Sequence, residues 1–185
     1  THLHSDHILD FPSFIVNIEV LGIKHKINIY SPTGAKDKLL NLLNLMYGDY
    51  FNDFISKYLN FINIVDNQSF IINNSAFKTK EVLHTGIESY GFIVDSKLGI
   101  TGDTSLCNGV KEIFNNTETI ICDCSLLTGD IYHMGIDNII ELLKDRKEKR
   151  VLLTHFRDST KKIVQNMNLN SVFIVEDGYT FILEE

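Results

Sequence analysis

The 185-residue sequence lacks the features that mark membrane, secreted and nucleic-acid-coating proteins. No apolar run approaches the roughly 18 residues that a membrane-spanning helix requires, and the histidine-rich start contains no apolar signal-peptide segment. Basic residues number 17 against 24 acidic ones, and the net charge of −7 argues against a broad nucleic-acid-binding surface. We therefore expect no membrane partner. The one basic cluster, at residues 144–150, is expected to be a solvated helix end.

Cysteine is scarce: Cys107, Cys122 and Cys124 are the only three. Without a secretory signal, so few cysteines favour reduced thiols and a cytoplasmic protein. Cys122 and Cys124 alternate on an apolar, β-branched segment, so both point to the same side of a predicted strand. We expect them to be core residues rather than metal ligands or a redox pair.

The composition that remains is ordinary for a globular protein, with 44% hydrophobic residues and a mean hydropathy of zero. It is expected to form one domain over residues 1–185. The chain begins at Thr1, inside a motif that no strand precedes. Metal ligands normally lie on loops held by a scaffold on both sides, so we expect the domain to be incomplete at its N-terminus and to lack its first strands.

Hydrophobic periodicity predicts a layered α/β protein, with many strands first and strand–helix alternation afterwards. The predicted helices span residues 36–47, 50–59, 105–114, 136–147 and 159–167. The predicted strands span residues 15–21, 24–30, 61–66, 69–73, 76–83, 90–95, 98–101, 117–123, 150–154, 172–176 and 179–183. Three hairpins are expected, with turns at Gly22, between Asp95 and Leu98, and at Asp177–Gly178. In the helix at 136–147, the inward side chains are expected to be Ile139, Ile140, Leu142 and Leu143.

The opening stretch THLHSDH is the strongest chemical signal, because His2, His4, Asp6 and His7 are four metal-binding residues among the first seven. In an extended segment, alternate side chains point the same way, so His2 and His4 can converge on one ion. Asp6 and His7 follow on a turn and can face a second ion. Imidazole suits zinc, iron or manganese, and a carboxylate hardens the second site.

Three further candidate ligands each follow a predicted strand. His84 ends EVLH, Asp103 lies in ITGDT, and His155 ends VLLTH. A histidine at a strand end is often a core or capping residue, but together with the opening motif these three complete two metal sites. His25, flanked by lysines, is expected to be a solvated surface residue.

The motifs THLHSDH, LHTGIESYGF, GITGDT and LLTHF occur in this order, and together they resemble the metallo-β-lactamase superfamily of metal-dependent hydrolases. NIYSPTG, and ICDCSLL followed by YHMGIDNI, make the RNase Z and phosphodiesterase-like branch the most similar one. The resemblance implies an αββα sandwich and two divalent ions, zinc first, with manganese or iron as alternatives. It assigns the first ion to His2, His4 and His84, the second ion to Asp6, His7 and His155, and the bridge to Asp103.

A two-metal centre implies that a metal-bridging hydroxide attacks a phosphorus atom in line. His133 lies ten residues after Asp123, which ends a predicted strand, and this pair can give a proton to the leaving oxygen. The candidate catalytic residues are therefore Asp6, Asp123 and His133. The alternatives are a histidine that caps the helix near Ile136 and an ordinary strand-end aspartate.

The substrate is the least determined point. RNase Z enzymes grip folded RNA with a protruding arm rich in glycine and proline, and the stretch 34–74 contains neither a proline nor a basic cluster. Arg157 stands where the tRNA-processing pattern has a serine after THF. A small or cyclic phosphodiester therefore fits better than an RNA end. The alternatives are a tRNA 3′-end processing endonuclease, an ester, thioester or lactone hydrolase, and a binding module without turnover. A homodimer also stays open.

Overall fold

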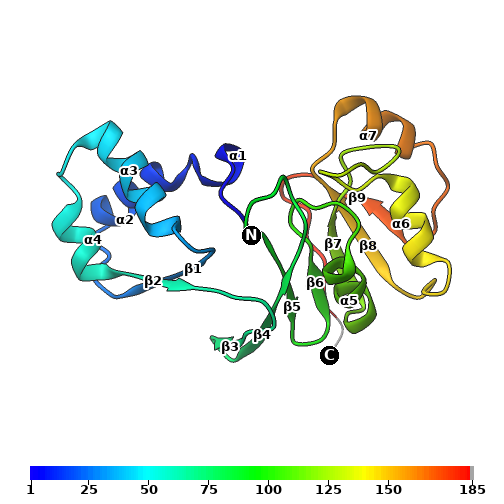
Figure 1. Cartoon of the computed structure of the whole chain (residues 1–185), viewed down its shortest axis with the longest axis horizontal. Coiled ribbons are helices and arrows are strands. Elements are labelled where there is room, and N and C mark those ends of the chain that lie inside the picture. The colour runs from blue at the N-terminus through cyan, green and yellow to red at the C-terminus, as the bar shows by residue number, and fades with distance from the viewer. Residues whose placement is uncertain (184–185) are drawn as a thin grey trace. The chain divides into compact units, whose positions relative to one another are not determined.

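The computed structural model describes residues 1–183, and the chain divides into two compact units (Figure 1). The helical unit comprises His2–Ile64, and the sheet unit comprises Thr1 together with the chain from Val65 onward. Each unit has its own hydrophobic core. That residues 1–185 act as one domain stays a prediction.

The helical unit contains four helices and one pair of strands. Its elements are α1 (Ser5–Ile8), α2 (Phe11–Val20), β1 (Ile27–Ser31), α3 (Ala35–Tyr47), α4 (Asn52–Tyr58) and β2 (Leu59–Asn63). β1 and β2 pair in parallel, from Ile27 opposite Leu59 to Ser31 opposite Asn63. Parallel strands require a crossover connection, which α3 and α4 supply. The helices predicted over 36–47 and 50–59 are confirmed.

The strand predicted over residues 15–21 is wrong, because this segment belongs to helix α2. Ile15 and Ile18 are both buried and stand three residues apart, which is the spacing of one helix face. Gly22 has φ of 67°, and the N–H of Ile23 donates to the carbonyl of Ile18 at 3.0 Å. This is the hydrogen bond of a helix end with a left-handed glycine, so Gly22 terminates a helix and makes no hairpin.

The remaining strand predictions in this unit are right in kind but shifted. The strand predicted over 24–30 begins only at Ile27, and its partner is β2 instead of the predicted hairpin neighbour. The strand predicted over 61–66 begins earlier, at Leu59, directly after α4. Partner choice depends on contacts between residues 32 positions apart, such as Ile27 and Leu59, which local alternation does not encode.

The sheet unit contains a seven-stranded mixed sheet in the order β3-β4-β5-β6-β7-β8-β9. Its strands are β3 (Ser69–Ile72), β4 (Ser75–Glu81), β5 (Tyr90–Val94), β6 (Leu98–Ile100), β7 (Thr119–Asp123), β8 (Arg150–Thr154) and β9 (Val172–Ile174). Its helices α5 (Asn108–Asn116), α6 (Ile136–Leu143) and α7 (Asp158–Val164) connect the strands from β6 onward. The strands from β3 to β6 pair antiparallel, including the predicted hairpin of β5 with β6, and the strands from β6 to β9 pair in parallel.

The direction of the strands decides where the loops emerge. β4 and β6 are both antiparallel to β5, and β6, β7 and β8 are parallel to one another. The carboxyl ends of β4, β6, β7 and β8 therefore lie at the same edge of the sheet. Loops that follow these four strands bring their side chains together, although the strands are far apart in the sequence.

Two predictions at the C-terminal side of this unit are wrong. The hairpin around Asp177–Gly178 does not form: β9 pairs with β8 in parallel, and residues 179–183 carry no strand. The predicted helix 136–147 ends at Leu143, and Ile140 is 38% exposed instead of facing inward. The buried residues of α6 follow a three-residue spacing (Ile136, Ile139, Leu142), and Ile140 lies outside that face.

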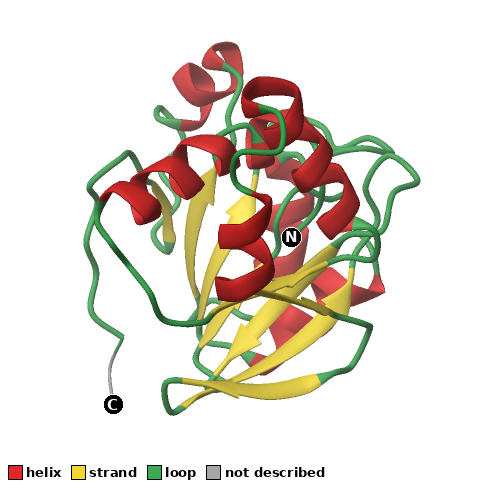
Figure 2. Cartoon of the chain, turned by 90° about the vertical axis from the view of Figure 1, so that its left-hand side faces the viewer, coloured by secondary structure: helices red, strands yellow, loops and turns green. Residues whose placement is uncertain are grey.

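The helices of the chain are short. Figure 2 shows them in red, separated by strands and long green loops, and the longest, α3, has 13 residues. A membrane span needs about 20. Among residues 1–183, no helix is both long and apolar enough to cross a bilayer.

At Gly109, in the first turn of α5, this helix packs closely against the sheet. A Cβ atom at this position would stand 1.9 Å from the carbonyl oxygen of Glu81 in β4. Gly109→Ala is expected to lower the free energy of unfolding by about 1–3 kcal/mol, because the helix must shift away from the strand. Urea denaturation measures this change, with exposed Asn108→Ala as the control. Equal midpoints for both variants would contradict the close packing.

Candidate metal centre

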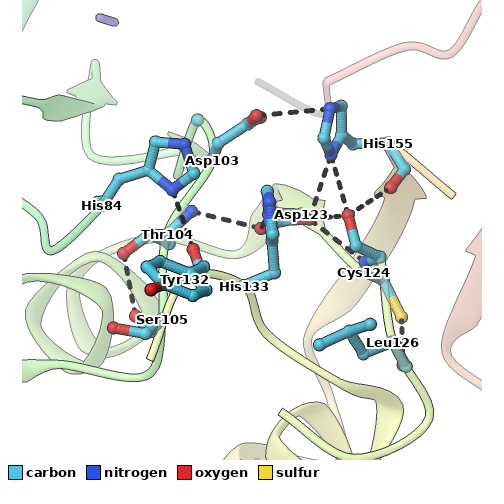
Figure 3. Close-up of polar contacts among 12 residues, drawn as sticks. His84, Asp103, Thr104, Ser105, Asp123, Cys124, Leu126, Tyr132, His133 and His155 are labelled. Atoms are coloured by element: carbon cyan, nitrogen blue, oxygen red, sulfur yellow. Dashed lines mark hydrogen bonds and ion pairs between the residues drawn. The ribbon is translucent and has the colours of Figure 1, made fainter. Parts of the chain in front are cut away.

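Five ionisable side chains meet at the shared strand edge of the sheet unit (Figure 3). His84 follows β4, Asp103 follows β6, Asp123 ends β7 and His155 follows β8. His133 comes from the loop between β7 and α6. The prediction that candidate ligands follow strands is thus borne out by the position of each residue.

The side chains lie at distances that suit shared ligation. Nε2 of His155 stands 3.2 Å from Oδ2 of Asp103. Two ligand atoms at about 2.0–2.1 Å from a tetrahedral zinc ion are about 3.3 Å apart. Possible ligand atoms of His84, Asp103 and His133 lie within 4.8 Å of one another. Imidazole nitrogens with a carboxylate form the donor set that zinc, manganese or iron accept, so these residues fit a divalent transition metal.

Hydrogen bonds orient the two histidines that the sequence assigns as ligands here. Nδ1 of His84 lies 2.8 Å from the carbonyl oxygen of Tyr132, which only accepts, so Nδ1 carries the proton. Nδ1 of His155 lies 2.8 Å from Oγ of Ser125, whose own proton can go to the carbonyl of His155 at 2.8 Å. Both rings are therefore held through Nδ1. Their Nε2 atoms keep the lone pair that a metal needs.

Asp123 is a buried carboxylate, 2% exposed, with a complete set of partners. Its Oδ2 accepts from Nδ1 of His133 at 2.9 Å and from the backbone N–H of Thr104 at 3.1 Å. Its Oδ1 accepts from the backbone N–H of Ser125 at 3.1 Å and lies 3.2 Å from the Ser125 hydroxyl oxygen, whose one proton goes either to this carboxylate or to the carbonyl of His155. These bonds hold the Asp123 carboxylate in place and, through it, fix the His133 ring. The predicted pair of Asp123 and His133 is thus present as a direct contact.

The loop that carries His133 is held by a second carboxylate. Oδ1 of Asp130 accepts from the backbone N–H of His133 at 2.8 Å and of Tyr132 at 2.7 Å. These two bonds hold the pKa of Asp130 below its usual value. Sequence inspection did not single out Asp130. Its turn position, three residues before His133, is the local signal that would have identified it.

The opening histidines lie together within the helical unit. The ring centroids of His2 and His4 are 4.8 Å apart, and those of His2 and His7 are 4.2 Å apart. His4 is extended, with φ of −78° and ψ of 157°, and Asp6 and His7 lie on the short helix α1. This agrees with the predicted extended segment followed by a turn. Oδ2 of Asp6 stands 3.5 Å from Nε2 of His7. The predicted ligand set therefore divides between the two units, four residues in this one and three in the sheet unit.

Ser125 was not identified from the sequence, yet it contacts both Asp123 and His155. Ser125→Ala is expected to weaken metal binding roughly 10–100-fold, since residues that orient a histidine ligand have effects of this size. Competition with a chromophoric chelator measures the affinity. Ser125→Thr keeps the hydroxyl and should restore most of it. Unchanged affinity in Ser125→Ala would show that His155 needs no support from this hydroxyl.

Several other residues have the structural or surface positions that the sequence predicts for them. Cys122 and Cys124 are fully buried, and burial raises the pKa of the Cys124 thiol to about 12 and that of Cys122 well above its usual value. Both stay neutral and pack in the core. His25 is exposed and precedes β1. Arg157 is exposed at the start of α7.

Comparison with known proteins places this geometry in context. Ribonuclease Z of Macrococcus caseolyticus (strain JCSC5402) is 21% identical over 251 aligned positions, which cover all of this chain and 80% of that protein. Among solved structures, the metallo-β-lactamase fold protein YhfI from Bacillus subtilis has a TM-score of 0.74 at 18% identity, covering 97% of this chain and 74% of that one. A diphosphatase from the PhnP family has a TM-score of 0.73 at 18% identity, covering 99% and 70%.

The fold is therefore the metallo-β-lactamase fold, and the resemblance read from the motifs is confirmed. The sequence profile of the family described as "Anti-Pycsar protein Apyc1" matches residues 1–180, and the chain belongs to this family.

Proposed function

We propose that the chain is a metal-dependent hydrolase that cleaves a small or cyclic phosphodiester. The observation that carries this proposal is the Asp123–His133 contact of 2.9 Å beside His84, Asp103 and His155. A phosphodiester has a poor leaving group that gains from a proton donor. An activated thioester or lactone has less need of one, so the pair favours phosphodiester chemistry over the ester alternatives.

The proposed metal ligands are the four candidates of the opening motif and the three candidates that follow strands. His2, His4 and His84 are assigned to one ion, Asp6, His7 and His155 to the other, and Asp103 to both. Zinc is the first candidate, with manganese or iron as alternatives. Two such cations, when bound, would supply an activated water and offset the negative charge of the phosphodiester.

The chain's own residues supply the remaining chemistry. His133, held at Nδ1 by Asp123, keeps Nε2 for a proton that passes to the leaving alkoxide oxygen. The Asp123 carboxylate stabilises the charged form of the ring before the transfer and keeps it oriented afterwards. Asp6 is proposed to act beside His7 in orienting the attacking water. Asp123 acts through the His133 ring, which it contacts at 2.9 Å, so it is a positioning residue.

An RNA end is the second candidate substrate, because the curated relative is described as a ribonuclease Z. A tRNA-processing enzyme needs many phosphate contacts to hold folded RNA. The segment after Gly34 forms α3, α4 and β2, whose side chains pack in the core of the helical unit. The net charge is −7. Both facts favour a small substrate.

Elemental analysis beside a substrate panel tests the proposal. The expected result is close to two transition-metal ions per chain and turnover of bis(p-nitrophenyl) phosphate and of a cyclic nucleotide. Faster cleavage of a tRNA 3′ trailer would favour the RNA candidate, and turnover of only thioesters or lactones would move the activity to that class. A protein that binds no metal would refute the proposal and leave a binding module. Sedimentation equilibrium of the same sample tests whether the chain forms a homodimer.

A further inference from the structure

The turn at residues 130–133 carries His133 and lies in the loop between β7 and α6. Its side chains give it little apolar support, because Ile131 is 74% exposed and Tyr132 is 46% exposed. The base of the loop is fixed by backbone bonds, such as the one from the N–H of Ile136 to the carbonyl of Leu126 at 3.0 Å. A turn with few buried apolar contacts keeps its conformation mainly through hydrogen bonds. The bonds that Asp130 makes therefore decide how this turn is arranged.

Asp130 closes the turn from both sides. Its backbone N–H donates to the carbonyl of His133 at 3.0 Å. In the other direction, its Oδ1 accepts from the backbone N–H of His133 at 2.8 Å and from that of Tyr132 at 2.7 Å. Hydrogen bonds to a carboxylate are shorter and stronger than those between neutral groups. One exposed side chain thus fixes the backbone of the two residues that follow Ile131.

The peptide group between Tyr132 and His133 links Asp130 to a second part of the site. Its N–H donates to Asp130, and its carbonyl accepts from Nδ1 of His84 at 2.8 Å (Figure 3). A peptide group is planar, and the described residues contain no cis peptide bond, so this N–H and this carbonyl point in opposite directions. Asp130 and His84 therefore hold the two ends of one rigid group. Hydrogen bonds in such a series also strengthen one another.

The same peptide group places the backbone of His133, because the Cα atom of His133 lies in its plane. The His133 ring is held separately, by Asp123 at 2.9 Å from its Nδ1. Two carboxylates thus act on this histidine, Asp123 on the ring and Asp130 on the main chain. A rotation of the peptide plane would move the His133 Cα atom and the acceptor of His84 together.

Resting on the proposed phosphodiesterase activity, we infer that Asp130 is a positioning residue that sets two groups of the site at once. These are the imidazole of His84, a proposed metal ligand, and the imidazole of His133, the proposed proton donor. Asp130 acts on both through the peptide group between Tyr132 and His133. Its acceptor oxygen is the part that matters, so an asparagine, which carries the same Oδ1 acceptor, should serve in its place.

Asp130→Ala on the full chain removes this acceptor. Competition with a chromophoric chelator should show metal affinity lowered by roughly tenfold or more, the effect of losing a group that orients a histidine ligand. With metal at saturation, kcat for adenosine 3′,5′-cyclic monophosphate should fall about 10–100-fold, because small displacements of a reacting group have effects of this size. kcat for bis(p-nitrophenyl) phosphate should fall less, since p-nitrophenolate leaves without a proton. Asp130→Asn should restore most of all three values.

Asp137→Ala is the matched control. Asp137 is exposed, and its Oδ1 also accepts from two backbone N–H groups, those of Gly129 at 3.0 Å and Asn138 at 2.7 Å. Its loss should lower the urea midpoint as Asp130→Ala does, but it should leave metal affinity and both kcat values unchanged. Equal effects of the two alanine variants on affinity and kcat would show general support of the loop and would overturn the assignment.

Amide hydrogen exchange in the metal-free protein separates this inference from the proposed activity. The N–H groups of Tyr132 and His133 should exchange about tenfold faster in Asp130→Ala, because each loses its bond to the carboxylate. If exchange rises and metal affinity falls in a protein that hydrolyses no phosphodiester, the positioning role stands and the proposed function fails. If turnover is present and Asp130→Ala changes neither metal affinity nor either kcat, the function stands and the positioning role is refuted, whatever the exchange rates.

Discussion

Asp103→Ala is expected to release bound metal and to lower kcat/KM for phosphodiesters by roughly 10³-fold or more, because a metal centre supplies several kcal/mol of transition-state stabilisation. Asp103 is the candidate bridge, buried at 5% exposure, with Oδ2 at 3.2 Å from Nε2 of His155. Removal of its carboxylate leaves the proposed ions with histidines and the single charge of Asp6.

Elemental analysis and turnover of bis(p-nitrophenyl) phosphate are measured on the same preparations. Asp145→Ala is the control, because Asp145 is an exposed carboxylate beyond α6 and should leave both values unchanged. Circular dichroism separates loss of metal from loss of fold. A folded Asp103→Ala protein that keeps its metal and its turnover would exclude a bridging role for this residue.

His133→Asn is expected to slow hydrolysis of a cyclic nucleotide by about 10²–10⁴-fold, the usual range for loss of a general acid. The leaving group there is a sugar alkoxide, which needs a proton. p-Nitrophenolate leaves without one, so kcat for bis(p-nitrophenyl) phosphate should fall much less. The difference between the two losses is the signature of proton donation.

Asp123→Asn should show the same pattern in a weaker form, since Asp123 acts through the His133 ring at 2.9 Å. His25→Asn is the control, because His25 is an exposed histidine before β1. Metal content should remain unchanged in the His25 variant. An equal loss for both substrates in His133→Asn would indicate a binding or structural role and would rule out the general acid.

The candidate site was largely predictable because residue type and position after a strand are enough to indicate its side chains. His84, Asp103 and His155 each follow a strand, and loops after strands that run in the same direction meet at one edge of a sheet. The position of a residue after a strand and the direction of that strand do not depend on the details of side-chain packing. The helices α3 and α4 were found for the same reason, since the spacing of Leu39 and Leu43 is a property of the segment itself.

The wrong secondary-structure predictions occur where the same local sequence pattern is compatible with two different structures. Residues 15–21 are rich in β-branched side chains and read as a strand, yet Ile15 and Ile18 bury one helix face and Gly22 ends the helix. The Asp177–Gly178 turn does form, with the N–H of Tyr179 bonded to the carbonyl of Glu176 at 3.0 Å, but no strand returns from it. In each case the outcome depends on which partner the segment packs against.

Residue type and spacing alone thus indicate the candidate ligands, the strands that His84, Asp103 and His155 follow, and the metal-dependent class of chemistry, because these follow from short-range patterns along the chain. The tertiary structure alone decides that Ser125 and the Tyr132 carbonyl orient His155 and His84, and that a cavity lies beside His84. Those contacts join residues up to 48 positions apart. Hydrogen bonds and cavities at such separations arise only when the sheet has assembled.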